Sequence, residues 1–384
     1  MTTLEQLTEL NTLNECALEC TKQSRWKGTT QRYIADMLSK NINLRNDVLS
    51  GNYAVKPTID FSISERGHIR KIEAPVIRDR VLQKSMMKNV LTPNIRPYLI
   101  YDNYASLKLR GTSFARKRFD IMLRRYMAHN GTEGYILLFD FKSFFELIDH
   151  DVLKQLLAQK LKNEPDDVVA LIHYMIDTSS KTDKGLNLGG EPPQIFAVFY
   201  PTLIDIFVKV VLGIKYYGRY MDDGFVIAKT KEELVDILCK IEEKLSKLKL
   251  IINRKKTHIV KLKHGFTFLQ IKYNITPTGK ILKRPTHSKI TRERRRLKAF
   301  KRMYDNGKMT IEEIENCYKS WRGTFIKEHN AYRKTLASMD ALFKALFPIE
   351  IIKTQRSRNV LVRQANKEVS TEDLKYIGRN INLP

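Results

Sequence analysis

The alternation of apolar and polar positions predicts short strands and helices in the middle of the chain. Residues 135–139, YILLF, form a short apolar run that ends at Asp140, which favours a buried strand over a helix. Residues 149–162 then repeat apolar side chains at helical spacing. Two apolar runs, IKYYGRY and GFVIA, flank residues 221–223 and predict a hairpin with acidic residues at its turn.

A second group of elements is expected after this hairpin. Apolar residues between Leu234 and Leu248 recur on one helical face, and the run KLIIN at residues 249–253 then resembles a strand. The order of strand, helix, hairpin, helix and strand indicates an antiparallel α+β sheet backed by helices. The segment RERRRLKAFKRMY reads as a basic helix, and residues 310–347 predict two further helices in a separate module.

The first part of the chain has a different pattern. Residues 1–50 are polar and predict helices with one apolar stripe, and residues 52–73 predict short strands. A further helix, IRDRVLQKSMMKNVL, is expected after Pro75. The residues expected to form the apolar stripe of the first helices are Trp26, Tyr33, Ile34 and Met37.

The net charge of the chain indicates the class of its binding partner. The 384 residues carry a net charge of +26, which is more than solubility requires and indicates a polyanionic partner such as nucleic acid. The acidic N-terminal segment does not resemble a signal peptide, and no apolar run is expected to span a bilayer, so we expect a cytoplasmic protein that binds no membrane. The spacing of Cys16, Cys20, Cys239 and Cys317 suggests neither a zinc site nor a disulfide framework.

Three aspartates suggest a chemistry. Asp140 at a strand end and Asp222 with Asp223 at a hairpin turn supply hard oxygen ligands from two strands. Nucleotide transfer to a 3′ hydroxyl uses two divalent cations roughly 4 Å apart, one activating the hydroxyl and one neutralising the triphosphate. Ordinary turn chemistry also explains Asp-Asp-Gly, because these residues tolerate the backbone angles of tight hairpins. The strand order and the charge together favour the metal site.

These residues carry a resemblance to bacterial-type reverse transcriptases, including those of diversity-generating retroelements, retrons, group II introns and phage-defence systems. Residues 220–223, YMDD, resemble the YxDD box, and residues 139–150 resemble the first aspartate motif. Residues 70–83 are similar to the fingers motifs of the family, residues 253–257 to the motif after the palm helix, and residues 266–269 to the primer grip. The resemblance extends over about residues 65–275.

The resemblance implies roles for particular residues. Asp140, Asp222 and Asp223 would be catalytic and, with Phe141, would bind two Mg²⁺ ions, with Mn²⁺ as an alternative. Lys256 would protonate the departing pyrophosphate, although the adjacent Lys255 fits the same role. The remaining implied contacts are with the incoming nucleotide and are made by Arg70, Phe145 and Gln194.

Phe145 and Arg70 also fit ordinary structural roles that involve no nucleotide. Phe145 matches a ring that excludes the ribose 2′ hydroxyl, and it also fits a buried aromatic residue. Arg70 matches a fingertip cation over the nucleotide, and it also fits a solvated charge on a hairpin. Gln194 precedes Ile-Phe-Ala where many bacterial enzymes have Pro-Gln-Gly, and it resembles the Ser-Gln form of some retroelement and defence enzymes. This departure leaves fidelity and template choice open.

The basic helix near residue 292 suits phosphate binding. Its cations surround the predicted helix and fit either a grip on the template-primer duplex or a solvated face. The residues assigned to nucleic-acid binding are Arg292, Arg294, Arg295, Arg296 and Lys298.

The resemblance implies an α+β right-hand polymerase with an N-terminal helical region at residues 1–50, fingers at 51–126, palm at 127–275, helical thumb at 276–348 and a tail at 349–384. Fingers elements interleaved with the palm are compatible with this division. The expected activity is RNA-directed DNA synthesis, which extends a DNA primer with deoxynucleoside triphosphates on an RNA template. A dedicated non-coding RNA is one possible template. The alternatives are template-independent or protein-primed synthesis and a catalytically idle RNA-binding protein. Protein partners and oligomeric state are left open.

Overall fold

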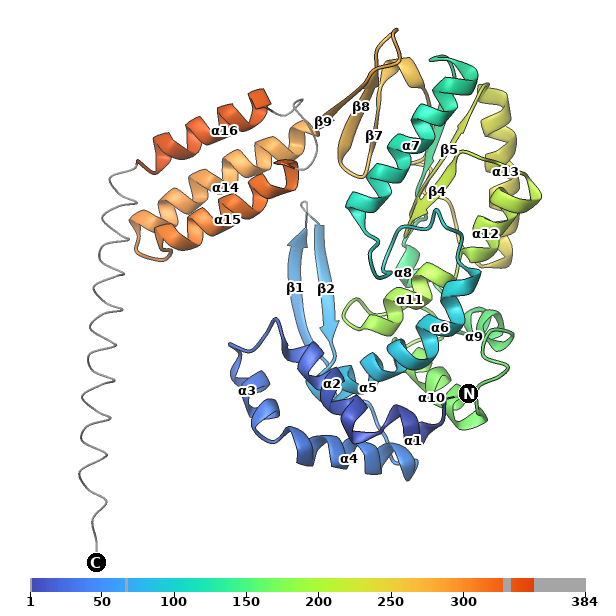
Figure 1. Cartoon of the computed structure of the whole chain (residues 1–384), viewed down its shortest axis with the longest axis vertical. Helices are drawn as coiled ribbons and strands as arrows, with labels where there is room; N and C mark the ends of the chain where they lie inside the picture. Colours follow the sequence, from blue (N-terminus) through green and yellow to red (C-terminus); the bar gives the residue numbers. More distant parts are fainter. Residues whose placement is uncertain (1, 66–67, 327–332, 349–384) are drawn as a thin grey trace, which may run out of the picture. The chain divides into compact units, whose positions relative to one another are not determined.

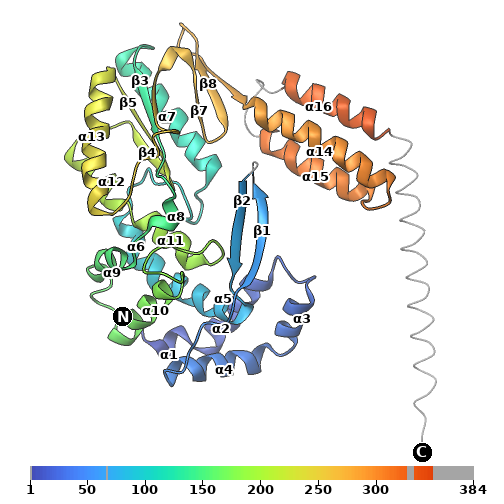
Figure 2. The ribbon, with the colours of Figure 1, turned by 180° about the vertical axis from the view of Figure 1, so that it is seen from behind.

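The computed structural model describes residues 2–65, 68–326 and 333–348 (Figure 1 and Figure 2). The chain divides into two compact units, Met1–Leu262 and Lys263–Pro384. This border precedes the strands at residues 266–275, which were expected to belong with the palm. The expected tail from residue 349 lies outside the described residues.

The N-terminal residues form helices, as their pattern predicts. Leu13 and Cys16 are fully buried and pack the second helix against its neighbours. The predicted apolar stripe is wrong at Trp26, which is 76% exposed, whereas Tyr33 is buried. The reason is that the helix ends at Thr21 and a turn follows, so Trp26 is out of phase with the helical positions. These helices are α1 (Leu4–Leu7), α2 (Leu10–Thr21), α3 (Gly28–Ala35) and α4 (Met37–Leu49).

An antiparallel hairpin follows, formed by β1 (Ile59–Glu65) and β2 (His68–Ala74). The strands begin later than the predicted position 52. The residues of β1 from Ile59 to Ser64 are all exposed, the apolar Phe61 and Ile63 included, so the hairpin projects from the core. The predicted helix after Pro75 is present as an α-helix with a π-helical continuation. The elements of this region are α5 (Ile77–Met86), η1 (Met87–Leu91), α6 (Thr92–Ile95) and η2 (Arg96–Tyr98).

A four-stranded antiparallel sheet forms the centre of the first unit, with the order β4-β5-β3-β6. The predicted strand of residues 135–139 and the predicted hairpin around residues 221–223 are confirmed. Residues 249–253 were wrongly expected to form the last strand. They run beside residues 140–142 with an isolated bridge between Phe141 and Ile252, and the ladder resumes at β6. The strands are β3 (Tyr135–Phe139), β4 (Tyr217–Tyr220), β5 (Asp223–Ala228) and β6 (His258–Lys261).

Helices cover both faces of this sheet. The ring of Phe119 on α7 (Thr112–Asn130) meets Phe225 of β5 edge-on at 4.8 Å, while Val226 faces the main core. The predicted amphipathic helix is α13 (Lys231–Lys247), and both ribbon views show the sheet between α7 and α13 (Figure 1 and Figure 2). Burial on both faces explains why the strands read as continuous apolar runs. The remaining helices here are α8 (Phe144–Leu147), α9 (His150–Ala158), α10 (Asp166–Asp177), α11 (Glu191–Phe199), α12 (Thr202–Ile206) and η3 (Phe207–Val211).

The sequence predicts no apolar run long enough to span a bilayer, but the structure contains one long apolar helical stretch. Among the described residues, the consecutive helical segments at Glu191–Val211 are long and apolar enough to do so by length and composition. Its most apolar window is 61% buried inside the protein. A core helix passes the same test, and Ile195, Phe196 and Ile204 of this stretch lie in the main core.

The second unit contains a three-stranded antiparallel sheet and a helical module with its own core. Leu297, Ile314 and Met339, from three different helices, are completely buried. Tyr318 stacks on Phe343 with ring centroids 4.5 Å apart. The predicted basic helix and the two helices after it are therefore confirmed. The elements are η4 (Leu262–His264), β7 (Phe266–Phe268), β8 (Ile271–Ile275), β9 (Ile281–Pro285), α14 (His287–Asp305), α15 (Ile311–Ile326) and α16 (Arg333–Leu346).

Candidate active site

Asp140 lies directly after the central strand β3 and is 3% exposed. Its carboxylate accepts hydrogen bonds from Asn253 Nδ2 at 2.9 Å and from Lys256 Nζ at 2.7 Å. The main chain of Asn253 also donates to the Asp140 carbonyl oxygen at 2.8 Å. These contacts fix the carboxylate at the strand end. Asn253 belongs to a segment that the sequence singled out, but its bond to Asp140 was not predicted.

The other two aspartates lie at the turn of the neighbouring hairpin. Tyr220 pairs with Asp223, so Met221 and Asp222 form a two-residue connection between β4 and β5. Met221 has φ +57°, a conformation that glycine adopts more readily than methionine. Because β5 is the direct neighbour of β3, the turn and Asp140 are carried by adjacent strands. The predicted acidic hairpin turn is therefore present.

The surroundings of Asp222 and Lys256 shift the pKa values of both groups. Burial, followed by the negative charge of Asp140, raises the pKa of Asp222, while the charges of Lys256 and Arg70 oppose the shift. The hydrogen bond to Asp140 raises the pKa of Lys256, and the charges of Asp140, Asp222 and Asp223 add to this effect. The Lys256 ammonium therefore contacts Asp140 directly, and the charges of Asp222 and Asp223 act on it from the turn. The structure brings Lys256 to Asp140 and resolves which of the adjacent lysines makes this contact.

The donor set suits hard divalent cations. Carboxylate oxygens are the ligands that Mg²⁺ prefers, and one of them, Asp140, already binds a positive charge, the Lys256 ammonium. Phe141 can add its main-chain carbonyl oxygen but not its ring, which is 1% exposed and packs 5.8 Å from Phe139. Within the described ranges, no three His, Cys, Asp or Glu side chains are close enough to form a ready metal site. The residues fit metal ions in their chemistry, and their side chains must approach one another more closely to hold one.

A buried ion pair that the sequence did not predict supports the turn. Arg219 and Asp205 are both 0% exposed, and Arg219 Nη2 lies 2.6 Å from Asp205 Oδ2. Arg219 Nη1 donates to the carbonyl oxygen of Met221 at 2.7 Å, while Nη2 donates to Val198 O at 2.9 Å. The guanidinium therefore links the strained turn to the helices behind it. An arginine in an otherwise apolar strand was the sequence signal, since arginine is rarely buried without a partner.

The implied nucleotide contacts occupy different positions. Arg70 is exposed on β2, where it pairs with Ile63 of β1. Its positive charge acts to lower the pKa of Asp222. Phe145 lies on α8 and is partly exposed, with its ring edge-on to Phe144 at 5.6 Å. Phe145 also packs against the main core. Its partial exposure leaves ring surface available to a substrate.

Gln194 lies on the exposed side of α11 and accepts a hydrogen bond from Ser106 Oγ at 3.1 Å. The segment before it packs closely against the hairpin. A Cβ on Gly189 would lie 2.1 Å from Glu73 O, so another side chain does not fit there. Lys84 pairs with Glu191 at the beginning of the helix. These contacts tie the segment around Gln194 to β2 and α5.

The cations of α14 belong to the second unit. Arg292, Arg295 and Lys298 are exposed and recur every three residues. The expectation of a helix that is basic all round is wrong, because one face buries Glu293 and Leu297 for packing. Arg296 donates to Glu293 at 2.8 Å and to the Cys317 carbonyl oxygen, and Arg294 donates to Ser338. Arg294 and Arg296 therefore also have structural partners.

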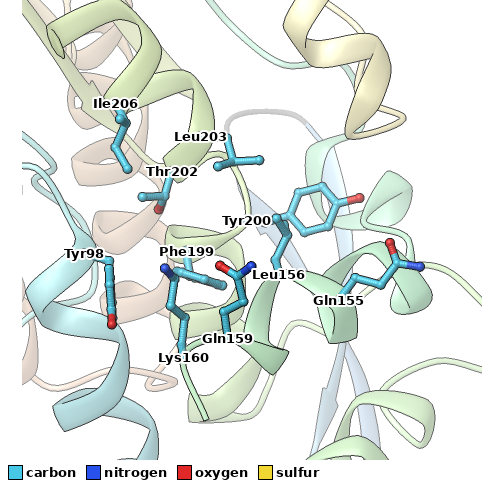
Figure 3. Close-up of a pocket in the computed structure, with 10 residues that line it drawn as sticks. All are labelled: Tyr98, Gln155, Leu156, Gln159, Lys160, Phe199, Tyr200, Thr202, Leu203 and Ile206. Carbon is cyan, nitrogen blue, oxygen red and sulfur yellow. The ribbon is translucent and has the colours of Figure 1, made fainter. Parts of the chain in front are cut away.

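A cavity of about 270 Å³ lies elsewhere in the first unit, between α9, α11, α12 and the residues near Tyr98 (Figure 3). None of the predicted site residues lines it. Lys160 lies over the ring of Tyr98 at 3.6 Å from its centroid. Tyr200, which also lines the cavity, donates to Leu248 O and thereby contributes to the packing behind the sheet.

Comparison with known proteins relates this arrangement to a family. Residues 56–273 match the model of the reverse transcriptase (RNA-dependent DNA polymerase) family, which covers all three aspartates. No curated protein sequence matches the chain. A telomerase from Candida albicans, in complex with a TWJ fragment of telomeric RNA, is similar over 80% of this chain and 55% of its own, with 12% identity and a TM-score of 0.50.

A truncated apo telomerase from Candida tropicalis is also similar, over 60% of this chain and 56% of its own, with 16% identity and a TM-score of 0.47. The chain thus spans little more than half the length of these proteins. At such identities, the likeness to the Candida albicans structure concerns the mixed α+β fold. Because the family model matches more than half of the residues, the chain belongs to the reverse transcriptase (RNA-dependent DNA polymerase) family.

Proposed function

We propose that this chain is an RNA-directed DNA polymerase that extends a DNA primer along an RNA template. The observation that carries the proposal is the placement of Asp140 after β3 and of the Asp222–Asp223 turn at the start of the adjacent strand β5, with Lys256 bonded to Asp140. Two adjacent strands hold these carboxylates, which gives the rigid support that nucleotidyl transfer requires. The family membership of the chain supports the same activity.

The side chains have distinct parts in this reaction. Divalent cations at the carboxylates would activate the primer hydroxyl and neutralise the triphosphate. Asn253 and β3 hold Asp140 in place, and Arg219 holds the turn that carries Asp222. Lys256, when displaced from Asp140, is close enough to this centre to supply a proton to the departing pyrophosphate.

We also propose a bacterial-type enzyme that acts in the cytoplasm within a retroelement or an anti-phage system. The support is the sequence around Gln194, which resembles the form found in such enzymes. Its expected partners are an RNA template, a DNA primer and deoxynucleoside triphosphates. The Candida albicans telomerase was solved with RNA, and the net charge of +26 supports a nucleic-acid partner for this chain as well.

Primer extension tests the proposed activity. Purified protein should extend a DNA primer on an RNA template with Mg²⁺ or Mn²⁺ and should stop after chelation. Extension without a template, or product joined covalently to the protein, would instead indicate template-independent or protein-primed synthesis. Binding of RNA without any incorporation would support the catalytically idle alternative.

Phe145→Ala is expected to increase ribonucleotide incorporation relative to deoxynucleotide incorporation by about tenfold, because removal of the ring makes room for a 2′ hydroxyl. The cost to stability should be below the roughly 3–5 kcal/mol of a buried aromatic, since Phe145 is partly exposed. Incorporation ratios on protein shown to be folded measure the effect. Phe144→Leu is the control, since Phe144 is buried beside it. An equal ratio in wild type and Phe145→Ala would leave Phe145 with a packing role.

Changing Arg292, Arg295 and Lys298 together to glutamine is expected to weaken binding to a template-primer duplex by roughly tenfold or more at moderate salt. The slope of log affinity against log salt should fall by about one for each lost phosphate contact. Arg296→Gln is the contrasting control, because Arg296 bonds to Glu293 and should affect stability more than binding. Parallel salt dependences for wild type and triple variant would show that this face is merely solvated.

A further inference from the structure

A basic loop with an exposed aromatic ring connects α2 and α3. Trp26 is 76% exposed in this loop, whereas the other tryptophan of the chain, Trp321, is 8% exposed in the core of the second unit. An indole ring in water loses the free energy of burial that such a ring usually gains. The exposed ring therefore offers an apolar surface to a ligand that matches the charges around it.

The charges around Trp26 define the chemistry of that ligand. Lys22, Arg25 and Lys27 of the loop are exposed, and the Lys27 ammonium lies 5.3 Å from the Trp26 ring centroid. Arg32 follows on α3, while the sequence from residue 20 to residue 35 contains no aspartate or glutamate. A flat aromatic surface among cations matches a nucleobase flanked by phosphates. An acidic peptide would use the cations and leave the ring unexplained.

The loop is held in a defined shape. Ser24 N donates to Thr21 O at 2.9 Å, and Lys27 N donates to Ser24 O at 3.0 Å. Thr30 Oγ1 on α3 donates to Ser24 Oγ at 3.2 Å, which joins the loop to the following helix. The end of α2 is tied to α5 by the guanidinium of Arg80, which donates to Cys20 O at 3.0 Å. The ring is therefore presented from a fixed support, which lowers the entropy cost of stacking.

We propose that the Trp26 loop, residues 22–27, is a binding site for unpaired RNA, with a base stacked on Trp26 and neighbouring phosphates on Lys22, Arg25 and Lys27. This inference rests on the proposed function for the identity of the strand, because the template is the RNA that remains unpaired before copying. Both ribbon views place α2 and α3 beside the foot of the β1–β2 hairpin, in the same unit as the three aspartates (Figure 1 and Figure 2). The loop would hold the template strand outside the centre where it is copied.

Fluorescence titration tests this site, because one of the two tryptophans lies in it. Oligoadenylate added to the full-length protein should quench the part of the emission that is lost in Trp26→Phe. Trp26→Ala should weaken binding by about tenfold, and Trp26→Phe by less, since a smaller ring remains. The salt dependence should be unchanged in both variants, because they keep the phosphate contacts. Changing Lys22, Arg25 and Lys27 to glutamine should reduce the salt dependence instead.

Four nucleic-acid ligands separate stacking from charge. An abasic strand and a fully paired duplex have phosphates but offer no free base, so Trp26→Ala should bind both as the wild type does. Trp26→Ala should bind primed templates with an unpaired RNA overhang more weakly than the wild type does. It should bind primed templates with an unpaired DNA overhang on the primer as tightly as the wild type. Leu38→Ala is the control for loss of an exposed apolar side chain, since Leu38 is 56% exposed on α4.

Several results would overturn the site. They are wild-type affinity of Trp26→Ala for oligoadenylate, an equal loss with the abasic strand, and a loss confined to the DNA overhang. These measurements need neither metal nor nucleotide, so a protein without polymerase activity would still report on the loop. Conversely, normal primer extension with no Trp26 effect would contradict the loop assignment and leave the proposed function intact. Thermal unfolding should be nearly unchanged in Trp26→Ala, because the ring makes little packing contact.

Discussion

Asp222→Asn is expected to reduce primer extension by at least about 1,000-fold while the protein remains folded. The carboxylate is at a partly exposed turn, so the nearly isosteric amide leaves no cavity. It removes one of the three negative charges that act on Lys256 and weakens the attraction for divalent cations. Single-turnover incorporation and RNA binding, measured on the same preparation, separate loss of chemistry from loss of substrate.

The same substitution should increase stability at neutral pH. Burial and Asp140 raise the pKa of Asp222 above its ordinary value of 3.8, so the folded protein binds this proton more tightly than the unfolded chain. Stability is therefore lost as the pH rises through the window between the ordinary and the folded pKa, and above this window the penalty is fully present. The neutral asparagine removes it. The gain should be on the order of 1 kcal/mol or less and should disappear in acid below this window.

Thermal unfolding of wild type and Asp222→Asn at neutral and acidic pH measures this effect. Asp236→Asn is a matched control, because Asp236 is exposed and pairs with Lys240 four residues later on α13. It should retain activity and change stability only slightly. Wild-type extension by Asp222→Asn would refute the metal assignment. Unchanged activity together with increased stability would leave the turn as a structural feature.

The elements that carry the aspartates could be predicted because local pattern and tertiary burial agree. Residues 135–139 are apolar throughout since both faces of the sheet are covered, and the helical face from Leu234 to Leu245 is buried as predicted. The KLIIN prediction failed for a different reason. Leu250 and Ile252 are buried and Ile251 is 55% exposed, so the alternation is real. Pairing of this segment stops at an isolated bridge beside Phe141, and sequence cannot show how far a ladder extends.

The candidate site was predictable where short motifs carry it and not where distant residues meet. The three aspartates and Lys256 were identified from their motifs, whereas the contact of Asn253 with Asp140 joins residues 113 positions apart. The prediction for Trp26 failed because helical phase was extended across a turn that contains neither proline nor glycine before Gly28. The sequence does not distinguish the arginines of α14 from one another, whereas burial of Glu293 gives Arg296 a structural partner. Tertiary contacts decide each of these cases.

Asp205→Asn is expected to destabilise the protein by about 3–5 kcal/mol, because it leaves the guanidinium of Arg219 buried without its counter-charge. Asp205 also accepts the hydroxyl of Tyr217 at 2.6 Å, so the substitution disturbs a connected network. Arg219 Nη1 bonds to Met221 O, and loosening it should release the strained turn that carries Asp222. Activity should therefore fall even at temperatures where the variant is folded.

Two measurements distinguish turn positioning from general instability. The Mg²⁺ concentration needed for half-maximal extension should increase in Asp205→Asn at a temperature well below its unfolding transition, because the turn no longer holds its carboxylates in place. Ile204→Val, a deletion of one methylene beside Asp205 in the same core, should cost about 0.5–1.5 kcal/mol and leave the Mg²⁺ requirement unchanged. If Asp205→Asn is less stable but has the wild-type Mg²⁺ requirement when folded, Arg219 and Asp205 contribute to packing only. An increased requirement in Asp205→Asn alone would establish that the buried pair positions the turn from behind the sheet.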